Sequence, residues 1–237
     1  MAASLFAKTF LILGFQLAVT WISTVLVMKY FTGLYHAKSP LVRGETNEAG
    51  ELDLQLDRAR ITPFFWLILI VNIGLFIVLM SAGRTNLLVG IPVFTLWSIV
   101  TGVELALVLI SVDENLGSRV LGLTASIVFG CALIAIYSGI DFSFLGGILF
   151  IALCLLLLVN ILRLFVKMAS WEQGVTAFFG VLIFTGYLLF DFNRLAKAAA
   201  RPDLNTWPQA MELSISIYLD IINLFLELLE FLSEWTD

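Results

Sequence analysis

The sequence is divided into long uncharged runs, each about the length of one membrane crossing. A helix needs about 20 mainly apolar residues to span the hydrocarbon core of a bilayer. Hydrophobic residues make up 60% of the 237-residue chain and charged residues only 13%, proportions that exclude an ordinary soluble globular domain. The pattern predicts an all-α, polytopic membrane protein. The uncharged runs cover residues 9–28, 61–83, 85–103, 120–140, 142–162 and 173–190.

A seventh stretch, residues 210–232, has the same length and the same Leu, Ile and Phe content, although three carboxylates interrupt it. We interpret it as a seventh helix. Seven crossings leave no room for a soluble domain, so residues 1–237 are expected to form a single transmembrane domain, a seven-helix bundle. The expected helices cover about 9–28, 62–82, 86–110, 120–139, 143–165, 173–195 and 210–232.

The longest connection, about residues 31–60, carries a dense mixture of both charge signs. Within it, "ELDLQLD" alternates polar and apolar residues, which would place Leu52, Leu54 and Leu56 on one face of a short strand. A hairpin or lid is therefore one interpretation. The acids of this connection lack the ligand spacing and the turn glycine of a known calcium loop, so we favour a plain solvated loop over a calcium site. These acids are Glu45, Glu48, Glu51, Asp53 and Asp57.

Several function classes lack the residues that they need. Cys131 and Cys154 both fall within expected spans and build neither a disulfide framework nor a metal-ligand spacing. The net charge of −5 comes with no basic patch, so no nucleic-acid partner is expected. The first hydrophobic stretch lacks a cleavage-site pattern and is expected to be retained. No cofactor is predicted.

The seventh helix carries a polar stripe. A carboxylate within a span costs about 2.5–3.5 kcal/mol on insertion scales and should face the bundle interior. Steps of three and four residues from Asp220 collect further polar side chains on one face of the helix. We favour the wall of a water-filled path, with hydrogen bonding between packed helices as the alternative. The stripe consists of Glu212, Ser216, Asp220, Asn223, Glu227, Glu230 and Glu234.

The sixth helix offers a partner for Asp220. Asp191 ends its uncharged run, and Tyr187 and Arg194 lie on the same stripe. The short connection at 196–208 predicts that helices six and seven are antiparallel neighbours. Asp191 and Asp220 could then share a proton and titrate as a coupled pair. The alternative for Asp191 is a local ion pair with Arg194.

Glu104 adds an acid to the third helix, where it shares a face with Thr101 and Ser111. It either lines the same path or marks an early end of that helix. The candidates for lining a path are Glu104, Tyr187, Ser216, Asn223 and Glu227. Small residues in other helices are expected to permit close helix packing: Gly14, Gly122, Gly130, Gly146 and Gly147.

Three segments resemble signature segments of the Bax inhibitor family, also called transmembrane Bax inhibitor motif proteins. They are "DFSFLGGILF", "FTGYLLFDFNRLAK" and "LSISIYLDIINLFLELLEFL", all within the last 100 residues. The resemblance implies seven helices and a pH-sensitive calcium leak, with Asp191 and Asp220 as the proton-responsive gate and transient calcium ligands. It also implies that a basic residue, here Arg84, latches onto the acidic pair.

The resemblance further implies a bacterial-type member in the cytoplasmic membrane, with a cytoplasmic amino terminus. The expected partners are the lipid bilayer, calcium ions and protons, and the sequence names no protein partner. Three features depart from the family pattern: the long first connection, the acidic carboxyl end of the seventh helix and the acid Glu104 within the third helix.

Enzymatic alternatives fail on their motifs, so no enzyme activity is expected. An intramembrane aspartyl protease needs Gly-x-Gly-Asp at its second Asp, where this chain has "YLD". A zinc hydrolase needs several His or Cys ligands, and His36 is the chain's one histidine. A retinal protein needs a lysine in the last helix, and residues 210–232 contain none. The main alternative to an ion leak is a non-conducting membrane protein that binds and regulates other membrane or stress-response proteins.

Overall fold

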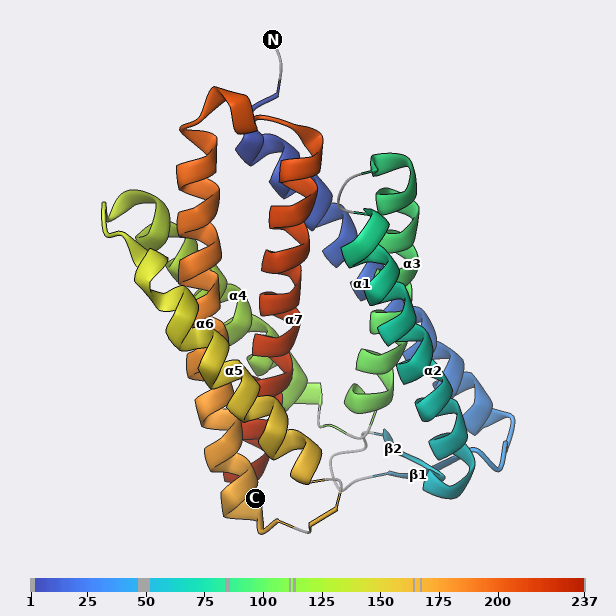
Figure 1. The fold of residues 1–237 in the computed structure, drawn as a ribbon. Helices are drawn as coiled ribbons and strands as arrows, with labels where there is room; N and C mark the ends of the chain where they lie inside the picture. The colour runs from blue at the N-terminus through green and yellow to red at the C-terminus, as the bar shows by residue number, and fades with distance from the viewer. Residues whose placement is uncertain are drawn as a thin grey trace. The chain divides into compact units, whose positions relative to one another are not determined.

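The computed structural model describes residues 3–46, 52–83, 86–110, 112, 114–163, 165–166 and 168–236. Within these residues the chain forms seven long helices and one short hairpin, as Figure 1 shows. The helices are α1 (Leu5–His36), α2 (Arg58–Val78), α3 (Leu87–Leu109), α4 (Glu114–Tyr137), α5 (Leu145–Leu162), α6 (Ser170–Ala199) and α7 (Trp207–Thr236). The expected all-α fold class is confirmed.

Helices α1 to α6 are each long and apolar enough to cross a membrane, by length and composition. The long helix outside this set among the described residues is α7, which carries the acids of the polar stripe. Large apolar side chains such as Ile70, Leu88 and Phe150 are exposed on the surface. Surfaces of this kind are unfavourable in water and are typical of contact with lipid. The chain is a multi-pass integral membrane protein.

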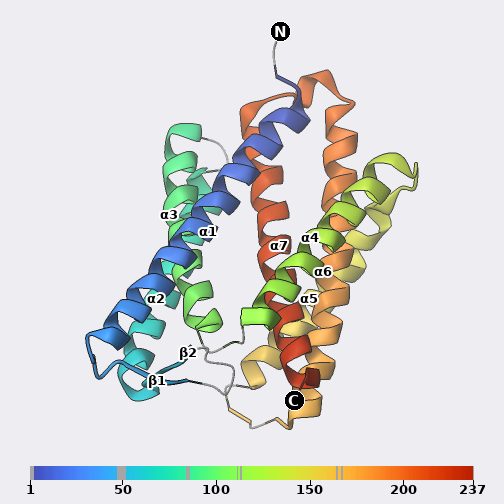
Figure 2. The ribbon, with the colours of Figure 1, turned by 180° about the vertical axis from the view of Figure 1, so that it is seen from behind.

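The chain divides into two compact units, which are described separately. Unit 1 contains Met1–Phe10 and Glu114–Asp237, and unit 2 contains Leu11–Asp113. In unit 1, α6 and α7 pack side by side and are joined by a short connection that includes the 3-10 helix η3 (Pro202–Leu204). Helix α4 packs against both α6 and α7, and α5 packs against α6 (Figure 2). The antiparallel arrangement expected for helices six and seven is present.

Hydrogen bonds between helices organise unit 2. Ser23 Oγ donates to the carbonyl of Ile99 at 2.9 Å, and Thr24 Oγ1 donates to the carbonyl of Gly102 at 3.0 Å. The backbones of α1 and α3 approach closely here, because a side-chain carbon at Gly102 would lie 2.5 Å from the carbonyl oxygen of Thr20. Hydroxyl groups and a glycine therefore hold α1 against α3, as small residues do between membrane helices.

The first connection forms the hairpin that the alternation in "ELDLQLD" offered as one interpretation. Strands β1 (Val42–Thr46) and β2 (Leu52–Leu56) pair in antiparallel register. The alternation of "LDLQL" directs Leu54 inward, where it packs with Val42, Phe31 and Ile110 in a small apolar cluster. The burial of this face, rather than the charges around it, determines the local structure.

Two expectations need correction. Helix α1 extends eight residues beyond the expected end at 28, and α2 begins at Arg58, because polar and charged residues continue a helix freely outside the hydrocarbon core. The expected packing role of most singled-out glycines was also wrong. A side-chain carbon at Gly14, Gly122, Gly130 or Gly147 would meet no described atom within 4 Å, whereas one at Gly146 would lie 2.9 Å from the ring of Phe190.

Candidate functional site

Asp191 on α6 and Asp220 on α7 meet inside unit 1. Their carboxyl groups lie within hydrogen-bonding reach of each other. Asp191 is 5% exposed and Asp220 is 6% exposed, so both are withdrawn from solvent. The structure thus brings together the two acids that the sequence singled out.

The pair needs a proton to complete its hydrogen bonding. Oδ2 of Asp220 is buried and has no hydrogen-bond partner among the described residues. Two ionised carboxylates can only accept hydrogen bonds, so a bond between them requires that one carry a proton. The arrangement can therefore exist in at least two charge states, and a like-charge pair of this kind titrates as a unit.

Arg194 supplies positive charge beside the pair. Its Nη1 lies 3.6 Å from Oδ1 of Asp191, and its Nη2 pairs with the carboxylate of Glu212 on α7. The local ion pair that the sequence offered as an alternative is thus present together with the Asp pair. Tyr187 lies within electrostatic reach of both aspartates. Asp191 therefore lies between Asp220 on one side and the ion pair of Arg194 with Glu212 on the other.

Polar contacts fix the loops around this end of unit 1. The amide of Asn193 donates to the carbonyl of Ile140 at 3.2 Å, and Lys197 Nζ donates to Oδ1 of Asp141 at 2.5 Å. Asp141 lies outside the spans, where the hydrogen bond from Lys197 lowers its pKa to about 2. Lys8 Nζ, near the start of α1, donates to the backbone carbonyl of Asn205 at 2.8 Å. The first two contacts tie the α4–α5 connection to α6, and the third ties the α6–α7 connection to the start of α1.

The other members of the predicted stripe on α7 have different surroundings. The amide of Asn223 donates to the carbonyl of Leu219 in its own helix at 2.8 Å, and Ser216 is half-buried. The carboxyl group of Glu227 lies against Gly180 of α6, where any side chain would overlap it. Glu227 is thus held within the α6–α7 contact, two helical turns beyond Asp220.

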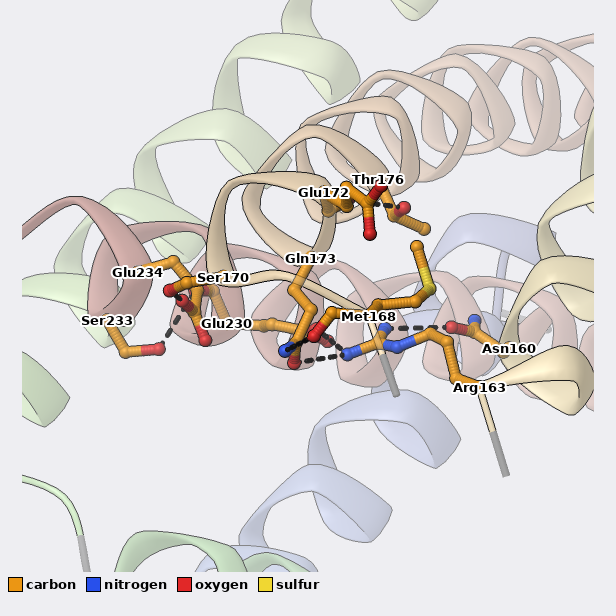
Figure 3. A network of polar contacts seen from close by, with 10 residues as sticks. All are labelled: Asn160, Arg163, Met168, Ser170, Glu172, Gln173, Thr176, Glu230, Ser233 and Glu234. Atoms are coloured by element: carbon orange, nitrogen blue, oxygen red, sulfur yellow. Dashed lines mark hydrogen bonds and ion pairs between the residues drawn. The ribbon is translucent and has the colours of Figure 1, made fainter. Parts of the chain in front are cut away.

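The stripe ends in a second polar network, which Figure 3 shows. Arg163, directly after α5, donates to Gln173 Oε1 at 3.0 Å and pairs with Glu230 of α7. Nearby, Ser170 Oγ donates to the carboxylate of Glu234. The residues come from the end of α5, the first turn of α6 and the last turns of α7.

Glu104 lies in unit 2, and its position is therefore described there alone. Its Oε2 accepts a hydrogen bond from Asn72 Nδ2 at 2.7 Å, and Asn72 Oδ1 accepts one from the indole of Trp97 at 2.9 Å. Oε1 of Glu104 is buried without a hydrogen-bond partner in the described part of the chain. Because α3 continues to Leu109, the interpretation of Glu104 as an early helix end was wrong.

Two predictions fall on residues that the structure does not describe. Arg84, the expected latch, and Ser111, the expected neighbour of Glu104, both lie outside the described residues. Among the residues that are described, no group of three or more His, Cys, Asp or Glu side chains is arranged to hold a metal ion. Asp191 and Asp220 by themselves offer only two carboxyl ligands to a cation.

A comparison with protein families decides what kind of protein carries this pair. The family model described as "Inhibitor of apoptosis-promoting Bax1" matches residues 2–236. The chain belongs to the Bax inhibitor family. The membership that the three signature segments indicated is confirmed, and the match extends beyond those segments to nearly the whole chain.

Relatives of this Bax inhibitor family member come from plants, viruses and bacteria. Protein LIFEGUARD 1 of Arabidopsis thaliana is 37% identical over 114 residues, 47% of this chain and 46% of the plant protein. A Golgi anti-apoptotic protein of vaccinia virus (strain Lister) is 35% identical over 129 residues, 54% of this chain and 51% of the viral one. An uncharacterized membrane protein of Streptococcus pyogenes serotype M1 is 28% identical over 163 residues, 68% of this chain and 70% of the bacterial protein. The chain thus spans about half the length of the plant and viral relatives.

The sequence reasoning missed the Arg163 network and the contact of Glu227 with Gly180. A signal for the first was present: α7 ends in three acids that have no basic residue near them on the same helix. Such acids need a partner from another helix, and Arg163 precedes α6 by a short connection. No comparable signal predicted which glycine would receive Glu227, because that depends on how α6 is rotated about its axis.

Proposed function

We propose that this protein is a pH-sensitive ion leak, conducting calcium, in which the protonation of Asp191 and Asp220 controls opening. The observation that carries the proposal is the meeting of these two buried carboxyl groups between two membrane helices. Ionisable residues within membrane segments are costly and are functional candidates by default. In this proposal the protein is a conductor and has no enzymatic activity.

The charge state of the pair offers two ways to control a path. Protonation removes the negative charge that holds a basic latch, for which the family resemblance offers Arg84. Deprotonation leaves two like charges side by side, which attract a divalent cation through hard oxygen ligands. A flux that rises at low pH assigns the first role to the pair, and one that rises at high pH assigns the second.

The family resemblance adds three elements to the proposal. The protein lies in a bacterial cytoplasmic membrane with its amino terminus in the cytoplasm, and Arg84 serves as the basic latch for the pair. The partners are the lipid bilayer, calcium ions and protons. The cations Lys197 and Arg201 at the carboxyl end of α6 agree with a cytoplasmic location of that end, because cytoplasmic loops carry an excess of Lys and Arg.

The decisive experiment measures calcium flux into liposomes that contain purified protein, between pH 5 and 8. Wild type is compared with Asp191→Asn and Asp220→Asn, which remove one negative charge and keep the shape of the side chain. We expect a pH-dependent flux that either substitution flattens. Asp203→Asn, in the exposed η3 segment, is the matched control for the loss of one carboxylate. If folded wild-type protein conducts no more than protein-free vesicles, the leak is refuted.

A second candidate is a non-conducting membrane regulator that binds other membrane or stress-response proteins. The name of the viral relative, a Golgi anti-apoptotic protein, favours this class, since it states an effect on cell death and no transport. The same liposomes separate the two candidates, because a regulator of this kind would give no flux at any pH.

A further inference from the structure

The far end of the α6–α7 contact contains a cation that joins three helices. Arg163 donates hydrogen bonds to Asn160 Oδ1 and to Gln173 Oε1, each at 3.0 Å, and forms an ion pair with Glu230. In Figure 3 these side chains converge on one guanidinium from α5, α6 and α7. Arg163 thus fastens the last turns of α7 to the neighbouring helices, and the planar guanidinium is suited to several such bonds at once.

The ion pair is largely withdrawn from water. The side chain of Arg163 is 21% exposed and that of Glu230 is 30% exposed. Partly buried charges are screened by salt much less than exposed ones. The pair is therefore stronger than the ion pair of Arg201 and Asp203, whose side chains are 63% and 62% exposed.

A second acid lies within reach of the same cation. Arg163 and Glu230 both act electrostatically on Glu227, whose carboxyl group is held against Gly180 between α6 and α7. Arg163 thus pairs directly with Glu230 and acts at longer range on Glu227, three residues earlier on α7.

We propose that Arg163 is a second, basic latch, which closes the end of the α6–α7 contact opposite to Asp191 and Asp220. This proposal rests on the proposed leak. The guanidinium pairs with Glu230, where a permeating cation would otherwise bind, and it holds the carboxyl end of α7 against α5 and α6. Release of Arg163 frees that end of α7 and leaves two carboxylates that attract a cation. Arg163 is a positioning residue for the gate and is not itself a conducting group.

The first test is calcium flux at a fixed pH for Arg163→Gln in liposomes. We expect flux to rise about tenfold, which corresponds to a shift of about 1.4 kcal/mol in the equilibrium between closed and open states. The matched control is Arg201→Gln, which removes an equal charge from an exposed ion pair and should leave flux unchanged. The exchange variant Arg163→Glu with Glu230→Arg restores the ion pair and should return flux to the wild-type level, even if a single variant folds poorly.

The second test links α6 to α7 covalently at the same end of their contact. Ser170 and Glu234, which form a hydrogen bond beside the latch, are replaced by Cys in a chain that lacks Cys131 and Cys154. A short, reducible bis-methanethiosulfonate reagent should lower the flux of the Arg163→Gln chain to the wild-type level, and a reductant should reverse this. A merely structural contribution of Arg163 to folding would not respond to the crosslink.

The outcomes separate this proposal from the one on which it rests. If Asp220→Asn flattens the pH dependence while Arg163→Gln conducts like wild type, the latch is refuted and the leak stands. If the exchange variant conducts like Arg163→Gln rather than like wild type, the ion pair is not the latch. If no protein conducts, both proposals fall.

Discussion

The contact at Gly102 provides a prediction about stability that is independent of function. In Gly102→Ala, the new methyl group would lie 2.5 Å from the carbonyl oxygen of Thr20 and 2.6 Å from Cβ of Ser23. The first of these atoms belongs to a helix backbone and cannot rotate away. The α1 and α3 helices must therefore separate locally, which stretches the two hydrogen bonds that Ser23 and Thr24 make across this contact.

Three effects determine the size of the change. Overpacking of a close contact costs about 1–3 kcal/mol. Each hydrogen bond between membrane helices contributes about 0.6 kcal/mol on average. Alanine is favoured over glycine in a helix by up to about 1 kcal/mol, which offsets part of the loss. We therefore expect Gly102→Ala to lower the free energy of unfolding by about 2 kcal/mol.

The assay is reversible unfolding by SDS in mixed micelles, followed by far-ultraviolet circular dichroism. The control is Gly74→Ala in α2, because a side-chain carbon there would meet no described atom within 4 Å. This substitution should leave stability unchanged or raise it slightly, through helix propensity alone. If Gly102→Ala proves as stable as Gly74→Ala, the close packing of α1 on α3 is not as the structure has it.

Two further predictions concern the polar contacts outside the spans. Lys8→Met removes the bonds to the backbone and side-chain oxygens of Asn205, and should lower the free energy of unfolding by about 1–3 kcal/mol, whereas the exposed Lys29→Met should not. The pKa of Asp141 is lowered from 3.8 to about 2 by its bond from Lys197, so its contribution to stability is present above pH 3.8 and is lost as the pH falls through 2. Asp141→Asn should therefore lower the melting temperature in detergent at pH 7, and its difference from wild type should shrink between pH 4 and 2. A difference in melting temperature that does not depend on pH would contradict this assignment.

The sequence predicted the parts of the fold that depend on the membrane itself. Six uncharged runs and one apolar stretch interrupted by acids located the seven helices, because any chain that crosses a bilayer must satisfy its backbone within each span. The meeting of Asp191 with Asp220 was also predictable, since a short connection forces α6 and α7 to be antiparallel neighbours. The family resemblance identified the same two residues independently.

The remaining features depend on how helices turn about their axes, which hydropathy does not encode. Gly102 and Gly180 receive close neighbours, whereas Gly14 and Gly122 do not, although all four are glycines in apolar helices. The ion pair of Arg163 could not be located for the same reason. The hairpin was only one interpretation of the alternation in "LDLQL", because the alternation shows which face can be buried and not which residues cover it.

The length of α1 gives the hairpin a further consequence. At 1.5 Å per residue, its 32 residues extend over about 48 Å, well beyond a hydrocarbon core of about 30 Å. The two-stranded hairpin has unpaired edges that hydrocarbon does not tolerate, so it lies outside the core and covers the emerging turns of α1 around Phe31 and Tyr35. Those turns cannot slide into lipid without stripping away Val42 and Leu54. The hairpin therefore limits how far the carboxyl end of α1 can enter the hydrocarbon core. In membranes of different thickness, α1 must accommodate hydrophobic mismatch by tilting.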